Sequence, residues 1–340
     1  MTEESDRKGP ARRVKASAAA RVDLAGGSLD LWPIGHIIPG SRTINLAVSL
    51  ASTVQCRATD EPGVALASSD LGVAYRWHNG QPPGPLALAE RLCAFFGVES
   101  GWSVAMRSDV PPGSGLGGSS AMSMALALAL RAISGKEMAD AALVGLCRDV
   151  EAAHLGIPTG VQDFWPAIFG GLLCIRYEPG GERVKSLAVP LKPLAARLVV
   201  AYSGQSRLSA GTNWALYKRF LDGEEGARRG LEGIAAVARD LEGALLAGDL
   251  DLAGSLLDQE WGHRCSLAEG ISTPATEVLM TAAKRAGALG GKACGAGGGG
   301  CLAFLVREGT RLDVETALER EGATVLPAHP VEGGHHLEVE

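Results

Sequence analysis

Alternating apolar and polar residues mark the first strands of the chain. From Ile44 to Leu50 every second side chain is apolar, which is the period of a strand with one buried face. This pattern predicts a strand over residues 44–56, and a second strand is predicted over 14–22. A loop with the sequence AGGSLDLWPIGHIIPGSRT joins the two. Further strands are predicted at 102–107, 172–178 and 197–202.

Apolar residues at helical spacing predict most of the remaining chain. The segment PLALAERLCAFFG, residues 85–97, predicts an amphipathic helix closed by Gly97. A more apolar helix is expected at 119–133, directly after a glycine-rich loop. Other helices are predicted at 137–154, 209–222, 225–247, 250–263, 273–288 and 310–321.

The order of these elements predicts two halves that both mix strands and helices. The pattern restarts after the sequence Leu191-Lys-Pro, so we place the boundary near residue 190. An N-terminal domain over 14–190 and a C-terminal domain over 191–340 are therefore expected, with an α+β or mixed α/β fold. We detect no internal repeat.

Composition and charge exclude several classes of protein. A formal net charge of −6 and a pI near 5.7 argue against a nucleic-acid partner, which needs a basic face. No apolar run approaches the roughly 18 residues of a membrane span, so no membrane partner is expected. Residues 1–13 resemble a frayed tail rather than a signal peptide.

The seven cysteines of the chain are scattered and include no CxxC pair. This distribution predicts buried free thiols in a reducing cytoplasm and argues against a zinc site. We therefore expect a cytoplasmic protein, and the sequence leaves a homodimer open.

The candidate chemistry lies in DVPPGSGLGGSSAMSMA, residues 109–125. GSGLGG matches the dinucleotide-binding pattern, but so does GAGGGG at 295–300, and SDVPP separates the first match from its strand. Glycines before an apolar helix can instead bring free backbone N–H groups to a phosphate, with Ser119 and Ser120 adding hydroxyls. The alternative is a tight turn with serine caps.

Four segments in order resemble the GHMP kinases (galacto-, homoserine, mevalonate and phosphomevalonate kinases). PPGSGLGGSSA is similar to the family signature P-x-x-x-G-L-G-S-S-A, with Gly118 in place of its first serine. The other three segments are ARVDLAGGSLD (20–30), GIPTGVQDFWPAIFGG (156–171) and GGKACGAGGGGCLAFLV (290–306). The resemblance spans residues 20–306.

The resemblance implies an α+β, two-domain GHMP kinase fold, with an N-terminal ribosomal-protein-S5-like domain and a C-terminal ferredoxin-like domain. It implies ATP and Mg²⁺ as cofactors, with Ser119 and Glu151 as metal ligands. For Glu151 the alternative is a solvated surface residue. The implied ATP-binding residues are Pro112, Gly113, Ser114, Gly115, Leu116, Gly117, Gly118, Ser119 and Ser120.

Asp163 matches the catalytic aspartate of the family, which implies that it orients and deprotonates the acceptor hydroxyl. Its alternative role is a helix cap. Arg21 matches the basic residue of the first signature and would keep Asp163 ionised. A structural ion pair with Asp23 is the alternative for Arg21.

Asp30 matches the aspartate with which galactokinases bind sugar hydroxyls, and Gly27 is expected beside it in the substrate site. Gly27 and Ser28 stand where galactokinases have Glu-His. Gly297 and Gly298 are also expected to contact substrate, unless the glycines there merely pack a turn.

These features predict an ATP-dependent kinase whose acceptor is a hydroxyl, by resemblance the anomeric one, of a small sugar or sugar phosphate. The pattern AGG-x-x-D, with GQSRLSA at 204–210, is closer to heptose-phosphate kinases and fucokinase-like sugar kinases. A kinase or decarboxylase of the mevalonate branch is one alternative. A non-catalytic sensor built on the kinase fold is another.

Overall fold

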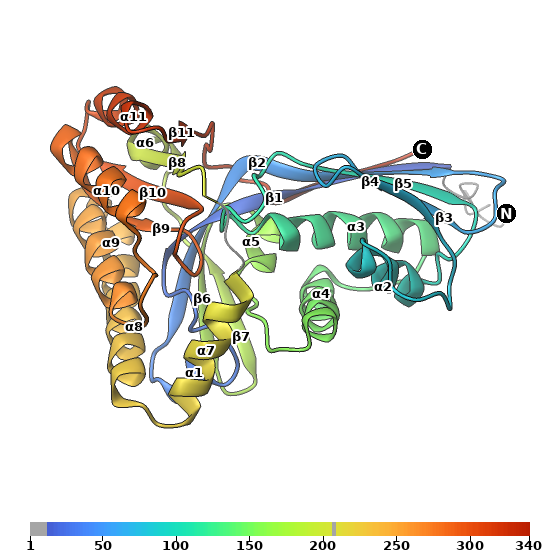
Figure 1. Ribbon diagram of the computed structural model, residues 1–340, viewed down its shortest axis with the longest axis horizontal. Coiled ribbons are helices and arrows are strands. Elements are labelled where there is room, and N and C mark those ends of the chain that lie inside the picture. The colour runs from blue at the N-terminus through green and yellow to red at the C-terminus, as the bar shows by residue number, and fades with distance from the viewer. Residues whose placement is uncertain (1–11, 206–208) are drawn as a thin grey trace, which may run out of the picture.

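Two β-sheets organise the chain in this computed structural model, which describes residues 12–205 and 209–340 (Figure 1). The large sheet has eight strands. Six of them are hydrogen-bonded in the order β12-β1-β2-β5-β3-β4, while β6 pairs with β2 and β7 pairs with β6. Their bounds are β1 (Arg13–Ala25), β2 (Arg42–Ala58), β3 (Val64–Ser68), β4 (Val73–Trp77), β5 (Trp102–Ser108), β6 (Leu172–Glu178), β7 (Gly181–Ser186) and β12 (His335–Val339). Residues 1–11 of the predicted tail and residues 206–208 of the segment 204–210 lie outside the described residues.

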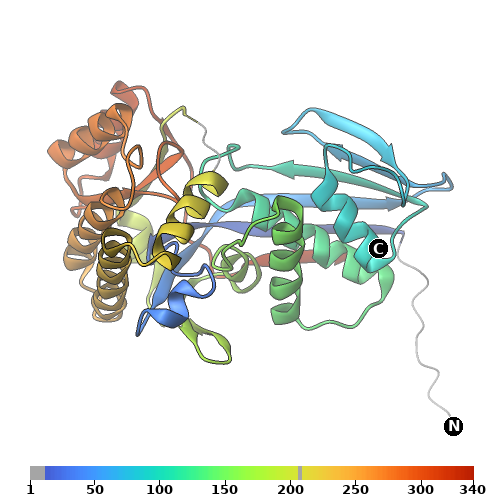
Figure 2. The same ribbon diagram turned by 60° about the horizontal axis from the view of Figure 1, so that its bottom comes forward.

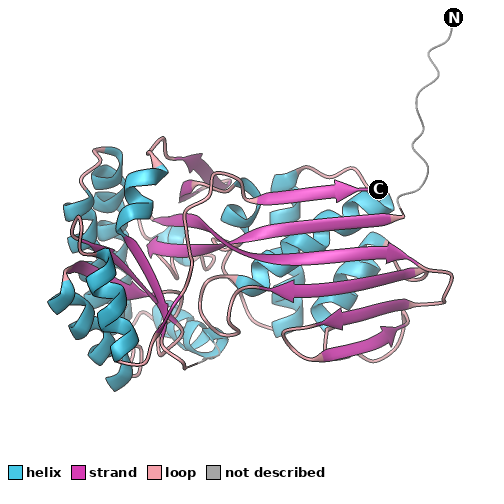
Figure 3. Cartoon of the chain, turned by 90° about the horizontal axis from the view of Figure 1, so that it is seen from above, coloured by secondary structure: helices cyan, strands magenta, loops and turns pink. Residues whose placement is uncertain are grey.

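The helices of the first half cover one face of the large sheet. They are α1 (Ile34–Ile37), α2 (Ala87–Phe96), α3 (Gly118–Ser134), α4 (Asp140–Leu155) and α5 (Phe164–Phe169). In Figure 2 the helices α2 and α4 lie in front of the sheet, whereas in Figure 3 the strands lie in front. The strand predicted over 44–56 is confirmed by β2, but residues 43–48 are all buried, and burial alternates only from Ser49 to Cys56.

The second half packs helices on a four-stranded sheet in the order β11-β8-β10-β9. Its strands are β8 (Leu198–Tyr202), β9 (Ala288–Ala293), β10 (Cys301–Val306) and β11 (Thr324–Val325). Its helices are α6 (Leu191–Arg197), α7 (Ser209–Leu221), α8 (Glu225–Leu246), α9 (Leu250–Cys265), α10 (Pro274–Ala286) and α11 (Arg311–Arg320). The α+β character is confirmed, and β12 returns to the large sheet beside β1.

The sequence predicts no strand at residues 288–293, yet β9 forms there. A Cβ on Gly290 would lie 2.1 Å from the carbonyl oxygen of Gly254, and one on Gly291 would lie 2.3 Å from the Phe304 ring. Glycine therefore allows this strand to pass close to α9 and β10. Because glycine has a low strand propensity, the sequence pattern did not predict a strand here. The short elements β3, β4, β7, α1, α5 and α6 are also absent from the prediction.

Helix α3 confirms the apolar helix predicted at 119–133. Ten of its residues, from Ser120 to Leu130, are buried, and it packs against β1, β2 and α2. Six of the seven cysteines are buried, and all seven are free thiols, as predicted. Among the described residues, no helix is both long enough and apolar enough to cross a membrane.

Candidate active site

A cavity of about 590 Å³ brings the four signature segments together. Its lining includes Arg21 and Asp30 from the first segment, the glycine loop before α3, Asp163 from the third, and Gly295 and Ala296 from the last. These segments are far apart in the chain, so their convergence comes from the tertiary fold.

The glycine loop leads directly into the N-terminus of α3. Gly113, Gly115 and Gly117 all have positive φ angles, between 69° and 79°, which other residues adopt only with strain. No side chain caps α3, so its first backbone N–H groups are free to bind an anion. The alternative of a serine-capped turn is therefore wrong. An uncapped helix end behind a glycine cradle fits a phosphate group.

The predicted ATP-binding residues line the cavity, with one exception. The side chain of Leu116 is fully buried in the core. Its carbonyl oxygen accepts a hydrogen bond from the Arg21 backbone N–H at 3.0 Å. Leu116 thus fixes the loop to β1, and its apolar side chain has no access to a ligand.

Two glycine loops from opposite halves of the chain are in contact. A Cβ on Gly115 would lie 2.2 Å from the carbonyl oxygen of Cys294, so the loop after β9 fits against the loop before α3. The Cys301 N–H donates a hydrogen bond to the Ser114 carbonyl oxygen at 2.7 Å. The position of the candidate phosphate loop therefore depends on the second half of the chain.

Gly297 and Gly298 do not line the cavity, in contrast to the prediction. The Gly298 N–H donates to the Ile271 carbonyl oxygen at 2.6 Å, and a Cβ on Gly297 would lie 2.7 Å from the Ile271 side chain. These glycines pack a turn, and the neighbouring Gly295 and Ala296 reach the cavity instead.

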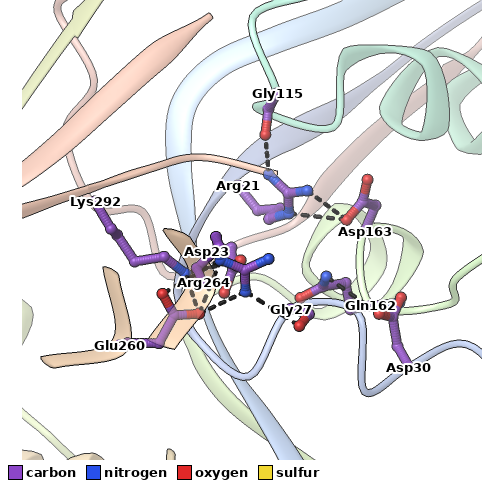
Figure 4. Close-up of polar contacts among 10 residues, drawn as sticks. All are labelled: Arg21, Asp23, Gly27, Asp30, Gly115, Gln162, Asp163, Glu260, Arg264 and Lys292. Carbon is purple, nitrogen blue, oxygen red and sulfur yellow. Dashed lines mark hydrogen bonds and ion pairs between the residues drawn. The ribbon is translucent and has the colours of Figure 1, made fainter. Parts of the chain in front are cut away.

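Arg21 and Asp163 form an ion pair at the cavity wall (Figure 4). Nε of Arg21 donates to Oδ1 of Asp163 at 2.9 Å, and Nη1 donates to the Gly115 carbonyl oxygen. Arg21 is 3% exposed, whereas the Asp163 side chain is 28% exposed and remains accessible. Asp163 is the residue before α5, but its side chain caps no backbone group. Arg21 is therefore paired with Asp163 and not with Asp23, and Asp163 does not serve as a helix cap.

Asp30 lines the same cavity and accepts hydrogen bonds from the backbone N–H of Gln162 at 3.2 Å and from its Nε2 at 3.3 Å. Burial, together with the charge of Asp163, raises the pKa of Asp30 to about 7. Gln162 was not among the predicted site residues, although it directly precedes Asp163 in the sequence.

Glu151 lies in α4 and lines the same cavity, so it is not a solvated surface residue. Burial and the charge of Asp163 raise the pKa of Glu151 to about 7. Since the folded protein holds the Asp30 and Glu151 protons to about pH 7, both groups favour folding at low pH. That contribution is lost as the pH rises through 7. Among the described residues, no group of three or more Asp, Glu, His or Cys side chains is placed to hold a metal ion by itself.

A group of four buried charges lies next to Arg21, below it in the view of Figure 4. Lys292 Nζ of β9 is 2.9 Å from Asp23 Oδ2 and 3.1 Å from Glu260 Oε1. Arg264 pairs with Glu260 within α9, and its Nη2 donates to the Gly27 carbonyl oxygen at 3.1 Å. We refer to Asp23, Lys292, Glu260 and Arg264 as the buried charge cluster.

The buried charge cluster also explains why residue 27 is a glycine. A Cβ on Gly27 would lie 2.4 Å from Asp23 Oδ2 and 3.0 Å from Arg264 Nη2. Gly27 lines the cavity on its other side, as predicted for a substrate-site residue. Lys292, Glu260 and Arg264 were not among the predicted site residues. Of these three, only Lys292 lies inside one of the four signature segments.

Comparisons with known proteins agree with these motifs. Residues 85–171 match the family described as "GHMP kinases N terminal domain", and residues 241–324 match "GHMP kinases C terminal". The mevalonate kinase of Thermococcus onnurineus is 26% identical over 338 residues, which are 92% of this chain and 95% of that protein.

Two sugar-related kinases are also similar. The D-glycero-alpha-D-manno-heptose 7-phosphate kinase of Campylobacter jejuni is 28% identical over 222 residues, 63% of this chain and 64% of that one. The Lactococcus lactis galactokinase solved with galactose shares the fold, with a TM-score of 0.77 at 16% identity, covering 95% of each chain. The predicted GHMP kinase fold is thereby confirmed, while the boundary at 190/191 remains a prediction. The chain belongs to the GHMP kinase family and is an ATP-dependent kinase.

Proposed function

We propose that this kinase transfers the γ-phosphoryl group of ATP to a hydroxyl of a small sugar or sugar phosphate, with the anomeric hydroxyl as acceptor. The observation that carries the proposal is the contact of Arg21 with both Asp163 and the Gly115 carbonyl oxygen. This contact joins the candidate base to the candidate phosphate loop in one cavity.

In the proposed reaction, Asp163 takes the proton of the acceptor hydroxyl while that oxygen attacks the γ-phosphorus and ADP leaves. The Arg21 guanidinium keeps the Asp163 carboxylate oriented. The free N–H groups at the start of α3 would bind the nucleotide phosphates. The contact between Arg21 and Asp163 favours a catalyst over the non-catalytic sensor.

Glu151 and the exposed hydroxyl of Ser119 would hold Mg²⁺ at the same cavity. When bound, the metal ion would neutralise part of the negative charge of the phosphate groups. Glu151, Asp30 and Asp163 repel one another, and a bound cation would relieve that repulsion.

The charge of the cavity supports a polyol over a carboxylate acceptor. Among the described residues that line it, Arg21 is the one guanidinium or ammonium group, and it is already paired with Asp163. Four carboxylates line the same cavity, those of Asp30, Asp70, Glu151 and Asp163. A carboxylate such as Asp30 accepts hydrogen bonds from vicinal hydroxyls but repels an anionic acceptor.

A mevalonate kinase is the second candidate, because mevalonate kinases match this chain over nine-tenths of its length. An ADP-release screen with galactose, fucose, a heptose 7-phosphate and mevalonate decides between the two. We expect turnover of a sugar and none of mevalonate, and the reverse result would overturn the sugar assignment.

The variant Asp163→Asn tests the assignment of Asp163 as the general base. It should keep nucleotide affinity within a few-fold and lower turnover by ~10²–10⁴, the usual contribution of a general base. Calorimetric titration with MgADP measures the affinity. Full turnover by this variant would remove Asp163 from the base role.

A further inference from the structure

The buried charge cluster lies at the junction of the two halves, directly beneath the catalytic pair. Asp23 belongs to β1, whereas Lys292 belongs to β9 and both Glu260 and Arg264 belong to α9. All four side chains are at most 2% exposed, and their formal charges sum to zero. Such a set is stable only while each charge keeps its partner, because a lone buried charge is strongly unfavourable.

Asp23 competes with Asp163 for the guanidinium group of Arg21. The two residues are separated by one position on β1, so their side chains project from the same face of the strand. Burial lowers the pKa of Arg21, but the negative charges of Asp163 and Asp23 outweigh this effect and the pKa is raised. Both carboxylates therefore attract the same guanidinium.

Lys292 is the nearest cation to Asp23. Its Nζ is 2.9 Å from Asp23 Oδ2, yet neither carboxylate oxygen of Asp23 accepts a well-oriented hydrogen bond among the described residues. Burial raises the pKa of Asp23, but the positive charges of Lys292, Arg264 and Arg21 outweigh it, so the pKa is lowered. Asp23 is thus an ionised carboxylate that attracts three cations, in the order Lys292, Arg264 and Arg21, and Arg21 is the one beside it on β1.

We propose that Lys292 is a positioning residue that neutralises Asp23 and thereby leaves Arg21 free to hold Asp163 and the Gly115 carbonyl oxygen. Without the Lys292 charge, Asp23 draws the Arg21 guanidinium toward the buried charge cluster and away from Asp163. Because Lys292 lies on β9, correct packing of the second half on the first is required to align the catalytic pair. This inference rests on the proposed roles of Arg21 and Asp163.

Three variants test the proposal: Lys292→Met, Asp23→Asn and the double variant. Methionine keeps the length of the lysine stem and removes its charge. A shift of about 1 Å in a catalytic group can lower turnover roughly 100-fold, so we expect Lys292→Met to lose about 10- to 100-fold in kcat. The KM for ATP and the affinity for MgADP should change less than about threefold.

The double variant is the decisive one, because removing the competing carboxylate should make Lys292 dispensable. Asp23→Asn with Lys292→Met leaves Glu260 and Arg264 paired and restores zero charge. We expect its kcat to be at least about tenfold above that of Lys292→Met and close to that of Asp23→Asn. If Lys292→Met alone does not fold, recovery of a folded and active double variant supports the same conclusion. A double variant that is inactive or unfolded would overturn the proposal.

Crystal structures of the variants give a readout that needs no acceptor. The Arg21 Nε to Asp163 Oδ1 distance, 2.9 Å here, should lengthen in Lys292→Met, with Arg21 turned to Asp23, and return in the double variant. An unchanged Arg21–Asp163 pair in Lys292→Met would overturn the inference. Turnover is read with galactose, fucose, a heptose 7-phosphate and mevalonate. If wild type phosphorylates none of these, the proposed function fails while the crystal structures still decide this inference.

Discussion

Gly160→Ala tests whether Asp30 is held in place to bind the acceptor. A Cβ added at Gly160 would lie 1.8 Å from Oδ2 and 2.6 Å from Cγ of Asp30, whereas ordinary contacts begin at about 3.4 Å. Gly160 does not have a positive φ angle, so alanine brings no backbone strain there. The carboxylate of Asp30 must therefore move by more than about 1 Å.

This movement breaks the hydrogen bonds that Gln162 donates to Asp30 at 3.2 and 3.3 Å. Hydrogen bonds to charged groups contribute about 1.5–3 kcal/mol. If the acceptor loses one such bond to a misplaced Asp30, its kcat/KM falls by roughly 10- to 100-fold. The KM for ATP should be unchanged, because the hydrogen bonds described above join Asp30 to Gln162 and not to the phosphate loop.

The assay is steady-state ADP release at varied acceptor and fixed saturating ATP. Gly145→Ala is the matched control, since a Cβ there meets nothing within 4 Å and the residue lies in the same part of the chain. Equal acceptor kcat/KM in Gly160→Ala and wild type would refute the placement of Asp30 in the acceptor site. Loss of ATP binding would show instead that the whole cavity had been distorted.

Three other predictions follow from the same geometry. Raising the pH from 5 to 8 should lower the free energy of unfolding of the ligand-free enzyme, because the unfolded chain has already lost the Asp30 and Glu151 protons, whereas the folded protein holds them until about pH 7. Urea denaturation should show this loss, smaller in Asp30→Asn, and no loss would contradict the raised pKa values. Gly115→Ala should destabilise the protein by about 1–3 kcal/mol, because of its positive φ and the nearby Cys294 carbonyl oxygen; an unchanged urea midpoint would argue against the contact between the loops. Glu151→Gln should raise the Mg²⁺ concentration for half-maximal ADP release at least about tenfold, and an unchanged requirement would exclude Glu151 as a metal ligand.

The sequence alone determined the features that depend on near neighbours in the chain. The alternation from Ile44 to Leu50 predicted β2, and the apolar run after residue 119 predicted α3, because these periods reflect local backbone geometry. The loop before α3 could be assigned to a phosphate for the same reason, since glycines and a helix start are contiguous there. The position of Asp163 came from the resemblance of its segment to a family signature.

Only the tertiary structure decided which charged groups meet. Arg21 has Asp23 two residues away, yet it pairs with Asp163, 142 positions along the chain. Asp23 instead meets Lys292, and Gly297 and Gly298 turn away from the cavity that Gly295 and Ala296 reach. Charge pairing depends on distance in space and on burial, and neither quantity is set by spacing along the chain until the two halves pack together.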